Sequence, residues 1–514
     1  MHRKACVAAV GEDMDTLTAL DGAVGKLGTR PFLIEEKGTL SYRDVDRQSN
    51  SLALGLSRLG VEKRDRVALY MNGASDFVVS RLGVQKLGAM IVPLNTRLSP
   101  GEIAHILNDC EPKCLIAEAA LLGNLPEKWC NHCVTLGSGG VGVGRYEELV
   151  SEGSDKNPGV AVSSDDVAMI LYTSGTTGRA KGAVILHKNS VASGQWIKSA
   201  TGLNSEDILL SCIPMYSASS MNGYLIASLL SGTPWVITDK FSPDDVFKKI
   251  DEKKVTVLHG TGAQHGLIAN HPSYGERNLS SLRLLTWSNV LPLEMLRKMQ
   301  ARLSGIQFIQ FYGMTETSPI GTHISTPAMM ERPASCGKPI SGFSEIRLVD
   351  VGGKDVPPET PGEILIRTPG LMREYFKNPA ATREAIRDGW FHTGDLGKFD
   401  PEGYLYIVGR VKDVINRGGE KIFAPEVEEV LLSHPSVQDA AVVGVYHPIF
   451  GEEVKAFIVK KSGSEVGADE LRQHCEGKLS SYKIPKEVEF RSELPKNAMG
   501  KTLKYLLKEK PASS

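Results

Sequence analysis

Runs of apolar residues alternate with segments of helical spacing along the N-terminal part of the chain. An apolar run at 67–71 is followed by helical spacing at 76–88 and by a second apolar run at 90–94. This order of strand, helix and strand predicts a parallel α/β unit. Similar apolar runs recur at 167–172, 208–213, 235–238, 255–258 and 283–286. Because continuous apolar strands are usually covered on both faces, we expect helices on both sides of the sheets.

The pattern changes beyond residue 345. Segments 363–367 and 404–408 predict strands of an antiparallel or barrel-like region, and 409–413 is expected to be a junction. A compact α+β unit follows, with helices expected at 424–433 and 469–479 and strands at 439–443 and 454–459. The predicted fold class is therefore α/β. A large N-terminal domain at 1–409, with parallel α/β sheets and a β-barrel-like subdomain, precedes a small mobile α+β domain at 410–514.

Composition and charge narrow the class of protein. The chain has 514 residues, of which 41% are hydrophobic and 23% charged, as is typical of a globular protein. The net charge of −1 creates no field that would attract nucleic acid or an anionic membrane, so any bound anion needs a local site. No uninterrupted apolar stretch is long enough to predict a membrane span, and residues 1–14 lack the apolar centre of a signal peptide. Eight thinly spread cysteines favour a cytoplasmic location.

Four of the cysteines have a spacing loosely like that of a zinc ribbon, namely Cys110, Cys114, Cys130 and Cys133. Cys114 begins the apolar run 114–117, however, and this run predicts a buried strand. We therefore favour cysteines that pack as small apolar residues over a structural zinc site.

A run of hydroxyl residues and glycines directly follows the expected strand at 167–172. Glycines allow backbone N–H groups to turn inward, hydroxyls add neutral donors, and a lysine adds positive charge. Such a loop predicts a cradle for a polyphosphate. Ala180 stands where the G-x-x-x-x-G-K type of phosphate loop requires glycine, so that type is excluded. The candidate cradle residues are Thr173, Ser174, Gly175, Thr176, Thr177, Gly178 and Lys181.

This segment resembles the phosphate loop of the adenylate-forming superfamily, which includes acyl-CoA synthetases, peptide-synthetase adenylation domains and beetle luciferases. Four further segments resemble motifs of that family in the same order, at 312–317 (YGMTET), 389–397 (GWFHTGDLG), 409–421 (GRVKDVINRGGEK) and 495–502 (PKNAMGKT). The resemblance covers essentially the whole chain, and five ordered motifs make a chance match negligible.

The resemblance implies roles for residues around the triphosphate of ATP. Lys181 and the loop N–H groups would hold the β- and γ-phosphates, and Thr315 would hydrogen-bond the α-phosphate. Glu316 would bind Mg²⁺, which prefers oxygen ligands. Tyr312, in the same motif as Glu316, would lie at the nucleotide. These groups match the chemistry, because a carboxylate attacking a phosphate brings two anions together and needs fixed positive charge.

The resemblance also implies roles near the C-terminus. Asp395 would accept hydrogen bonds from both ribose hydroxyls, Arg410 would contact the same ribose, and Lys501 would bridge the carboxylate and the α-phosphate. Lys412 is at the hinge about which the small domain rotates between two half-reactions. In the second half-reaction the loop at Gly418 and Gly419 would replace Lys501, and coenzyme A would attack the acyl carbon.

The sequence departs from the family in the region expected to bind the acid. Trp287 stands where the family has glycine in an S-G-G-A-like loop, and Ser217 replaces the aromatic residue or histidine of many relatives. Small Ser217 opens space, so a bulky or unusual acid is expected rather than acetate. The candidate substrate-pocket residues are Ser217, Met221, Gly262, Trp287, Ser288 and Asn289.

The predicted function is that of an acyl-CoA ligase that uses ATP, Mg²⁺ and coenzyme A on a small-molecule carboxylic acid. One alternative is thioester formation only, from a supplied acyl-adenylate with impaired adenylation, because Trp287, Ser288 and Asn289 replace the family's loop on the adenine side. A second is loading of a separate carrier protein, since no fused carrier is expected after Lys501. A third, from another class, is a non-catalytic nucleotide-binding regulator. No nucleic acid partner is expected, and the oligomeric state is left open, with a homodimer as one alternative.

Overall fold

The computed structural model describes residues 13–72, 75–130, 133–138, 142–151, 153–173, 180–238, 240–288, 290–418, 420–496 and 500–508. The chain divides into two compact units. The first unit comprises Met1–Ile346 and Ile366–Phe391, and the second comprises Arg347–Leu365 and His392–Ser514. The second unit thus includes segments that precede residue 410, and the domain boundary expected after residue 409 stays a prediction.

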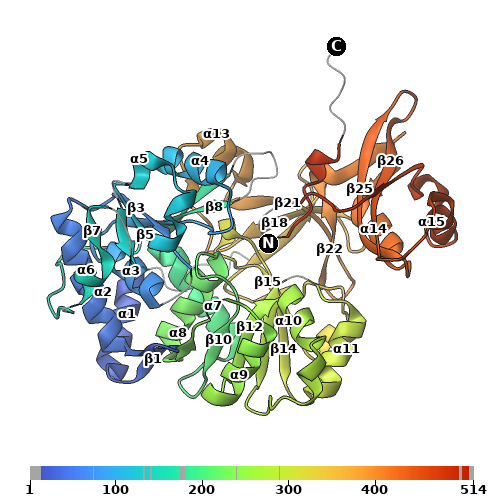
Figure 1. Ribbon diagram of the computed structural model, residues 1–514. Coiled ribbons are helices and arrows are strands. Elements are labelled where there is room, and N and C mark those ends of the chain that lie inside the picture. The colour runs from blue at the N-terminus through green and yellow to red at the C-terminus, as the bar shows by residue number, and fades with distance from the viewer. Residues whose placement is uncertain are drawn as a thin grey trace, which may run out of the picture. The chain divides into compact units, whose positions relative to one another are not determined.

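The first unit contains an eight-stranded sheet in the order β19-β9-β8-β4-β3-β5-β6-β7 (Figure 1). From β8 through β4, β3, β5 and β6 to β7, each strand pairs in parallel with the next. At the β8 edge, β9 pairs antiparallel with β8, and β19 pairs antiparallel with β9. The strands are β3 (Arg66–Tyr70), β4 (Met90–Pro93), β5 (Cys114–Glu118), β6 (Cys133–Leu136), β7 (Gly144–Arg145), β8 (Val167–Thr173), β9 (Lys181–Leu186) and β19 (Glu374–Tyr375). The α/β unit expected at 67–94 is confirmed as β3, helix α3 (Ser75–Lys86) and β4, and Cys114 is buried in β5 as expected.

A nine-stranded sheet in the order β16-β15-β14-β13-β12-β10-β11-β1-β2 forms the rest of the first unit's sheet structure. From β1 through β11, β10, β12 and β13 to β14, each strand pairs in parallel with the next. The strands are β1 (Pro31–Glu35), β2 (Gly38–Ser41), β10 (Leu209–Ser211), β11 (Trp235–Val236), β12 (Val257–Thr261), β13 (Leu284–Ser288), β14 (Gln307–Tyr312), β15 (Thr322–Ser325) and β16 (Lys338–Pro339). The expected strands between 208 and 286 are thereby confirmed.

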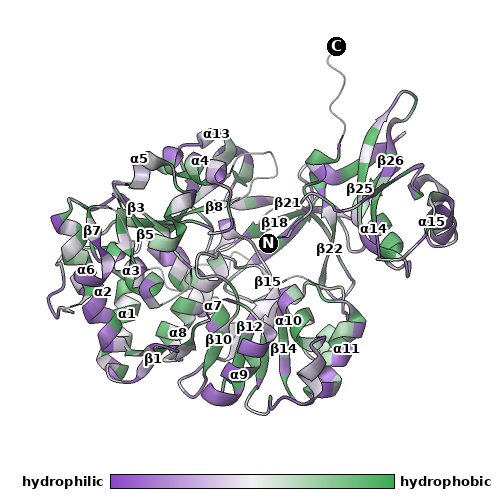
Figure 2. Ribbon diagram, viewed as in Figure 1, coloured by the Kyte–Doolittle hydropathy of each residue, from purple (hydrophilic) through white to green (hydrophobic). Residues whose placement is uncertain are grey.

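Helices accompany these strands, as the apolar runs predict. Helix α9 illustrates the local cause, since its Ser242 N-cap accepts a 3.2 Å hydrogen bond from the Asp245 backbone N–H. This helix buries Val246, Phe247 and Ile250, while Figure 2 shows hydrophilic residues on its visible side. The helices of the unit are α1 (Thr16–Leu27), α2 (Tyr42–Arg58), α3, α4 (Pro100–Cys110), α5 (Glu127–Cys130), α6 (Tyr146–Val150), α7 (His187–Thr201), α8 (Leu225–Ser231), α9 (Pro243–Lys253), α10 (Gly262–Ala269), α11 (Leu293–Arg302), α12 (Ala328–Glu331) and α13 (Pro379–Ala385).

One buried apolar cluster joins elements of both sheets in the first unit. Trp196 of α7 packs against Phe311 of β14, with ring centroids 5.0 Å apart, and Trp235 of β11 belongs to the same cluster. Burial of rings of this size is a major source of stability. The same cluster includes Val67 of β3 and Ile91 of β4, so the two sheets share one buried core.

The later part of the chain is built on antiparallel pairing. One five-stranded sheet contains β17 (Glu345–Val349), β18 (Gly362–Arg367), β20 (Ile386–Arg387), β21 (Trp390–Phe399) and β22 (Leu405–Arg410). A second contains β23 (Val414–Arg417), β24 (Glu420–Phe423), β25 (Val437–His447), β26 (Gly451–Lys460) and β27 (Glu487–Arg491). Helices α14 (Ala424–Leu432) and α15 (Ala468–Cys475) share a buried core with the second sheet. The helices and strands expected between 424 and 479 are confirmed.

Within the described residues, no helix is both long enough and apolar enough to cross a membrane.

Candidate functional site

The predicted phosphate cradle begins and ends on a β-hairpin of the first unit. Thr173 is the last residue of β8, Lys181 is the first residue of β9, and the two lie opposite each other in the antiparallel pair. The hairpin therefore brings the first and last cradle residues together. The candidate residues between them, Ser174, Gly175, Thr176, Thr177 and Gly178, lie outside the described residues.

The predicted metal ligand follows strand β14, on a sharp turn. Tyr312 ends β14, and the half-buried Thr315 and Glu316 belong to the short 3₁₀ segment Thr315–Thr317. A Cβ atom at Gly313 would lie 1.8 Å from the Pro319 carbonyl oxygen, so a larger residue would force this turn apart. The glycine of the motif thus has a steric reason, and it allows the chain to fold back directly after the strand.

The structure brings the hairpin and the turn together at the Glu316 carboxylate. Thr173 Oγ1 donates a 3.3 Å hydrogen bond to Glu316 Oε1, and the Tyr375 hydroxyl donates a 2.9 Å hydrogen bond to the same oxygen. The Lys181 ammonium lies 5.2 Å from the centroid of the Tyr375 ring. Burial, and next the Glu316 carboxylate, raise the pKa of Tyr375, so the phenol keeps its proton and acts as a donor.

Tyr375 is a site residue that the sequence motifs did not identify. It lies in the two-residue strand β19, which pairs antiparallel with β9, and Tyr375 is opposite Ala183. A single tyrosine between Glu374 and Phe376 carries little signal by itself. Only the pairing of β19 with β9 places it beside Lys181 and Glu316.

The oxygen atoms at this point suit a magnesium ion that is shared with a triphosphate. None of the described residues donates a hydrogen bond to Glu316 Oε2, whereas Oε1 accepts two. In proteins Mg²⁺ usually binds through one or two carboxylates together with substrate phosphates and waters. Across the part of the chain that the structure describes, no three His, Cys, Asp or Glu side chains are placed to hold a metal ion. The donors therefore fit Mg²⁺ bound with a nucleotide.

Four of the expected pocket residues end, or follow in the chain, parallel strands of the nine-stranded sheet. Thr261, at the end of β12, pairs with Ser288, at the end of β13, and Gly262 follows Thr261 as the first residue of α10. Ser217 and Met221 follow β10, and the Met221 N–H donates a 3.0 Å hydrogen bond to the Ser217 carbonyl. Ligands of open α/β sheets bind outside the carboxyl ends of the strands. Asn289 lies outside the described residues.

A buried polar cluster lies beside these residues. Thr286 Oγ1 forms hydrogen bonds of 2.5 Å with the Tyr224 hydroxyl and 3.0 Å with His259 Nδ1, and His259 Nε2 forms a 2.9 Å hydrogen bond with Ser219 Oγ. Ser219 and Tyr224 are the ends of a π-helix (Ser219–Tyr224), a rare element that is frequent at functional sites. Burial lowers the pKa of His259 to about 3, so this imidazole is neutral at pH 7.

Trp287 is located in the core of the first unit. Its side chain is fully buried, and its ring packs edge-on against His265, at 5.4 Å between centroids, and Phe308, at 5.8 Å. Successive side chains of a strand point to opposite faces, so Trp287 faces away from the Thr286 cluster. The ring is thus a packing element between β13 and its neighbours, and a contribution of Trp287 to the acid pocket stays a prediction.

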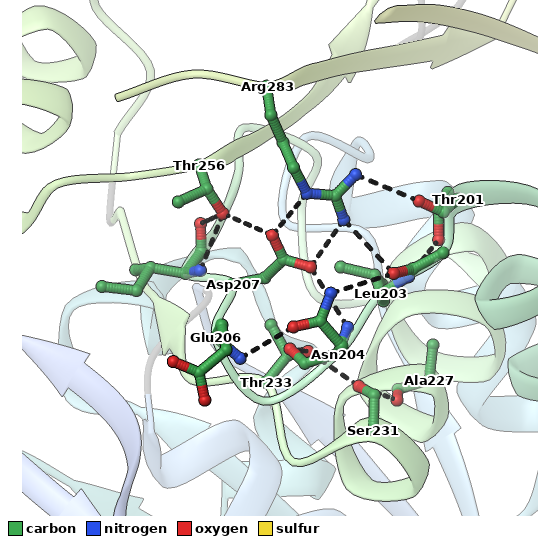
Figure 3. A network of polar contacts seen from close by, with 12 residues as sticks. Thr201, Leu203, Asn204, Glu206, Asp207, Ala227, Ser231, Thr233, Thr256 and Arg283 are labelled. Carbon is green, nitrogen blue, oxygen red and sulfur yellow. Dashed lines mark hydrogen bonds and ion pairs between the residues drawn. The ribbon is translucent and has the colours of Figure 1, made fainter. Parts of the chain in front are cut away.

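An ion-pair network fixes the opposite, amino-terminal edge of the same strands (Figure 3). Asp207, which precedes β10, accepts hydrogen bonds from Arg283 Nε at 2.6 Å and Arg283 Nη2 at 2.5 Å, and from Thr256 Oγ1 at 2.8 Å. Thr256 precedes β12 and Arg283 precedes β13. A bidentate pair of this kind sets geometry as well as energy. The network therefore aligns the three strands whose other ends carry the candidate pocket.

In the second unit, the two predicted ribose contacts are neighbours. Asp395 of β21 lies opposite Arg410 of β22, and Arg410 Nε lies 3.0 Å from Asp395 Oδ1. The Asp395 backbone N–H donates a 3.0 Å hydrogen bond to Thr393 Oγ1, which fixes the position of this mostly buried carboxylate. The pair of charges presents both an acceptor and donors, as a ribose diol requires.

Positive charge gathers around these residues. Burial, and with it Arg410, Lys501 and Lys508, lowers the pKa of Lys412 to about 8, against the opposite effect of Asp413. Burial and Arg410 lower the pKa of Lys501, while Asp395 raises it. Cations that depress one another's pKa favour an anionic ligand near them. The structure thus brings Asp395, Arg410, Lys412 and Lys501 into one electrostatic neighbourhood.

The predicted second-step loop lies between strands β23 and β24. Gly418 has a φ of +59° and its N–H donates a 2.7 Å hydrogen bond to the Phe450 carbonyl. This left-handed conformation explains the glycine. Arg417 beside it forms a 2.7 Å ion pair with Glu453 and lies over the Phe450 ring. The loop is anchored at Gly418, while Gly419 lies outside the described residues.

Comparison with known proteins gives the family. Residues 20–376 match the AMP-binding enzyme family, and residues 426–501 match the AMP-binding enzyme C-terminal domain. A feruloyl-CoA synthase of Amycolatopsis sp is 35% identical over 470 residues, covering 90% of this chain and 92% of its own length. An indoleacetate–CoA ligase of Aromatoleum aromaticum is 34% identical over 489 residues, covering 90% and 92%.

Solved structures agree with this result. The O-succinylbenzoate coenzyme A synthetase of Bacillus subtilis in complex with AMP has a TM-score of 0.86 at 29% identity, covering 97% of this chain and 99% of its own. The same enzyme with ATP and a magnesium ion has a TM-score of 0.85 at 28% identity, covering 96% and 99%. The predicted α/β fold class and the resemblance drawn from the five motifs are both confirmed. The chain therefore belongs to the AMP-binding enzyme family.

Proposed function

We propose that this chain is an AMP-forming acid–thiol ligase that converts a carboxylic acid to its CoA thioester. In the first step, a carboxylate oxygen attacks the α-phosphorus of ATP, the bond to the β-phosphate oxygen breaks, and pyrophosphate leaves. In the second step, the sulfur of coenzyme A attacks the acyl carbon, AMP leaves, and the thiol proton is released. One observation carries the proposal: the β8–β9 hairpin brings Thr173 to the carboxylate of Glu316, and Lys181 over the ring of Tyr375, whose hydroxyl donates to the same carboxylate.

The residues of the first unit would bind the triphosphate of ATP and its Mg²⁺ ion. Lys181 would hold the β- and γ-phosphates, Thr315 would donate to the α-phosphate, and Glu316 would hold Mg²⁺. Tyr312, at the end of β14, would lie against the nucleotide. The bound ion would supply positive charge to the phosphate oxygens as pyrophosphate departs. Supporting this assignment, the ammonium of Lys181 and the carboxylate of Glu316 both contact Tyr375.

The residues of the second unit would serve the ribose and the reacting carboxylate. Asp395 would accept from the ribose hydroxyls, Arg410 would contact the same ribose, and Lys501 would stabilise the charge that develops between the carboxylate and the α-phosphate. The neighbourhood of Asp395, Arg410 and Lys501 supports this assignment.

We further propose that residues 410–514 form the mobile domain and rotate about Lys412 between the two steps. After rotation, the Gly418–Gly419 loop would take the place of Lys501 so that the thiol can reach the acyl carbon. The left-handed conformation of Gly418 and the hydrogen bond from its N–H to the Phe450 carbonyl support a defined backbone at this residue. Rotation of a domain about a short hinge is a common way to present two sites in turn.

The acid is proposed to be bulky and aromatic. Small residues, Ser217 and Gly262, lie among the candidate pocket residues, and the curated relatives are named for feruloyl and indoleacetate groups. Met221, Trp287 and Ser288 complete the described part of the candidate pocket. A mostly apolar pocket with a few polar groups suits an aromatic acid with one or two polar substituents.

Two measurements test the proposal. Pyrophosphate release is followed with ATP, Mg²⁺ and a panel of aryl, arylalkanoic, alkyl and terpenoid acids, and CoA thioester is then measured for each acid that responds. We expect release with at least one aromatic acid and no release with acetate. Thioester formation without prior pyrophosphate release, or release that never leads to thioester, would contradict the two-step proposal.

The alternatives can be separated by the same assay. Impaired adenylation, which the loop residues Trp287, Ser288 and Asn289 suggest, stays an alternative, and robust pyrophosphate release with ATP and a matched acid would exclude it. The second alternative has a separate carrier protein as the acceptor in place of coenzyme A, and thioester formation with coenzyme A alone would exclude the need for it. The cytoplasmic location stays a prediction.

A further inference from the structure

The segment that carries Tyr375 is fixed to Glu316 and to the phosphate hairpin at several points. The Met372 N–H donates a 2.7 Å hydrogen bond to the Glu316 carbonyl, and the Tyr375 hydroxyl donates to Glu316 Oε1. The Tyr375 N–H donates a 2.9 Å hydrogen bond to Thr382 Oγ1, and the Phe376 N–H donates a 2.7 Å hydrogen bond to the Gly182 carbonyl. Backbone and side chain are therefore both held, so the phenol has little freedom to leave the carboxylate.

We propose that Tyr375 is a positioning residue that orients Glu316 toward the metal ion and Lys181 toward the phosphates of ATP. The inference rests on the proposed function, because it assigns a helper to two residues that the proposed function places at the triphosphate. Tyr375 itself touches neither the nucleotide nor the metal ion in this proposal.

The geometry at Glu316 gives the reason. Two donors, the Tyr375 hydroxyl and Thr173 Oγ1, occupy Oε1 and thereby fix the rotation of the carboxylate about its last bond. The other oxygen, Oε2, is then the one presented to a cation. Since Mg²⁺ demands nearly ideal octahedral geometry, an ordered oxygen binds it better than a rotating one.

The geometry at Lys181 gives a second reason. Its ammonium lies over the Tyr375 ring, 5.2 Å from the centroid, where a cation is attracted to the face of an aromatic ring. The hydroxyl thus orients Glu316, the proposed metal ligand, and the ring orients Lys181, which would bind the phosphates. Tyr375→Phe removes the hydroxyl alone, and Tyr375→Leu removes the hydroxyl and the ring together.

The test measures ATP binding by calorimetry without any acid, so that no reaction occurs. Each variant is titrated with ATP in the presence of Mg²⁺ and again in EDTA. For Tyr375→Phe we expect affinity in Mg²⁺ to fall roughly tenfold, as for loss of a hydrogen bond to a charged group, with affinity in EDTA unchanged. For Tyr375→Leu we expect ATP affinity to fall in both conditions, because Lys181 then also loses its contact with the aromatic ring.

Two controls isolate the mechanism. Tyr146→Phe removes another buried hydroxyl, one that donates to the Asp76 carbonyl at 3.1 Å, and it should leave ATP affinity unchanged in both conditions. In a Glu316→Gln background, Tyr375→Phe should have no further effect on affinity in Mg²⁺, because the phenol acts through the carboxylate. Equal thermal midpoints for Tyr375→Phe and the unaltered protein would exclude general unfolding.

Failure of the inference differs from failure of the proposed function. If the unaltered protein binds ATP equally with Mg²⁺ and EDTA, or not at all, the role given to Glu316 is wrong and the inference falls with it. If the unaltered protein shows the Mg²⁺ effect and Tyr375→Phe retains it in full, only the positioning role is overturned. An equal loss in Mg²⁺ and EDTA for Tyr375→Phe would likewise overturn it.

Discussion

Arg410 and Asp395 lie opposite each other on the neighbouring strands β22 and β21, with Arg410 Nε 3.0 Å from Asp395 Oδ1. The register of this strand pair, and the hydrogen bond from the Asp395 N–H to Thr393, hold the carboxylate in place. A ribose that binds at Asp395 therefore meets a preset acceptor, with a guanidinium beside it.

The first prediction concerns this carboxylate. Asp395→Asn keeps the shape of the side chain but replaces one acceptor oxygen by an amide donor, so it can no longer accept from both ribose hydroxyls. We expect ATP affinity to fall by at least about tenfold, as for a hydrogen bond to a charged group. Calorimetric titration with ATP measures it. Asp355→Asn is the matched control, since Asp355 pairs with Arg347 at 2.7 Å in the same unit, and an equal loss there would contradict the ribose assignment.

Lys501 should matter for the first step alone. Lys501→Ala removes the cation that would stabilise charge between the carboxylate and the α-phosphate, so kcat for pyrophosphate release should fall about 100-fold or more. Thioester formation from a supplied acyl-adenylate should persist. Lys496→Ala, at an exposed lysine that pairs with Asp439 at 2.6 Å, serves as the control. Unchanged pyrophosphate release in Lys501→Ala would refute the catalytic assignment.

A change at the proposed hinge should affect the second step and spare the first. Lys412→Pro fixes φ near −65° and so restricts rotation at this residue. We expect pyrophosphate release to remain within about twofold and thioester formation to fall at least about tenfold, in keeping with gating of the second step by domain motion. Lys412→Ala removes the charge but keeps the backbone free, and it should retain both steps. Loss of both steps in Lys412→Pro would argue against a hinge at this position.

Trp287 is expected to act through stability. Trp287→Ala removes a fully buried ring from contact with His265 and Phe308 and should lower the free energy of unfolding by about 3–5 kcal/mol. Trp287→Phe keeps part of the packing and should cost less. Denaturant unfolding measures both variants. If Trp287→Phe leaves stability unchanged but alters which acids are used, the ring contributes to the pocket instead.

Stability should also depend on pH through three buried histidines. Burial lowers the pKa of His259 to about 3 and the pKa values of His187 and His265 to about 4. Between pH 4 and the ordinary histidine pKa of about 6.5, the unfolded chain therefore binds more protons than the folded chain. The free energy of unfolding should fall as pH drops through this window, on the order of 1 kcal/mol for each pKa unit per histidine.

Denaturant unfolding at pH 7, 6, 5 and 4.5 checks this dependence. His187→Gln offers a direct comparison, because His187 Nδ1 is 2.7 Å from Thr16 Oγ1, while none of the described residues binds its Nε2. The variant should lose stability at pH 7 and show a shallower fall toward pH 5. An equally steep fall would mean that His187 is protonated in the folded protein.

Much of the fold follows from local pattern. The apolar runs at 67–71 and 90–94 correspond to β3 and β4, and the predicted helix between them corresponds to α3. These elements are predictable because strand and helix periodicity depends on the spacing of apolar residues that are close in sequence. The glycine of the YGMTET motif has its reason in the turn it makes, since a Cβ at Gly313 would meet the Pro319 carbonyl. The resemblance predicts Trp287 in a pocket-lining loop, whereas Trp287 lies in strand β13, which continues two residues beyond the apolar run 283–286.

The sequence by itself determined the family, the order of its elements and the chemical character of Lys181, Glu316, Asp395 and Lys501, because motif order and side-chain type are local properties. Only the tertiary structure decided that Tyr375 meets Glu316, 59 residues away, and that the Trp287 ring packs in the core. Strand pairing and the choice of sheet face depend on contacts between distant segments, and the packing of the whole unit selects among them.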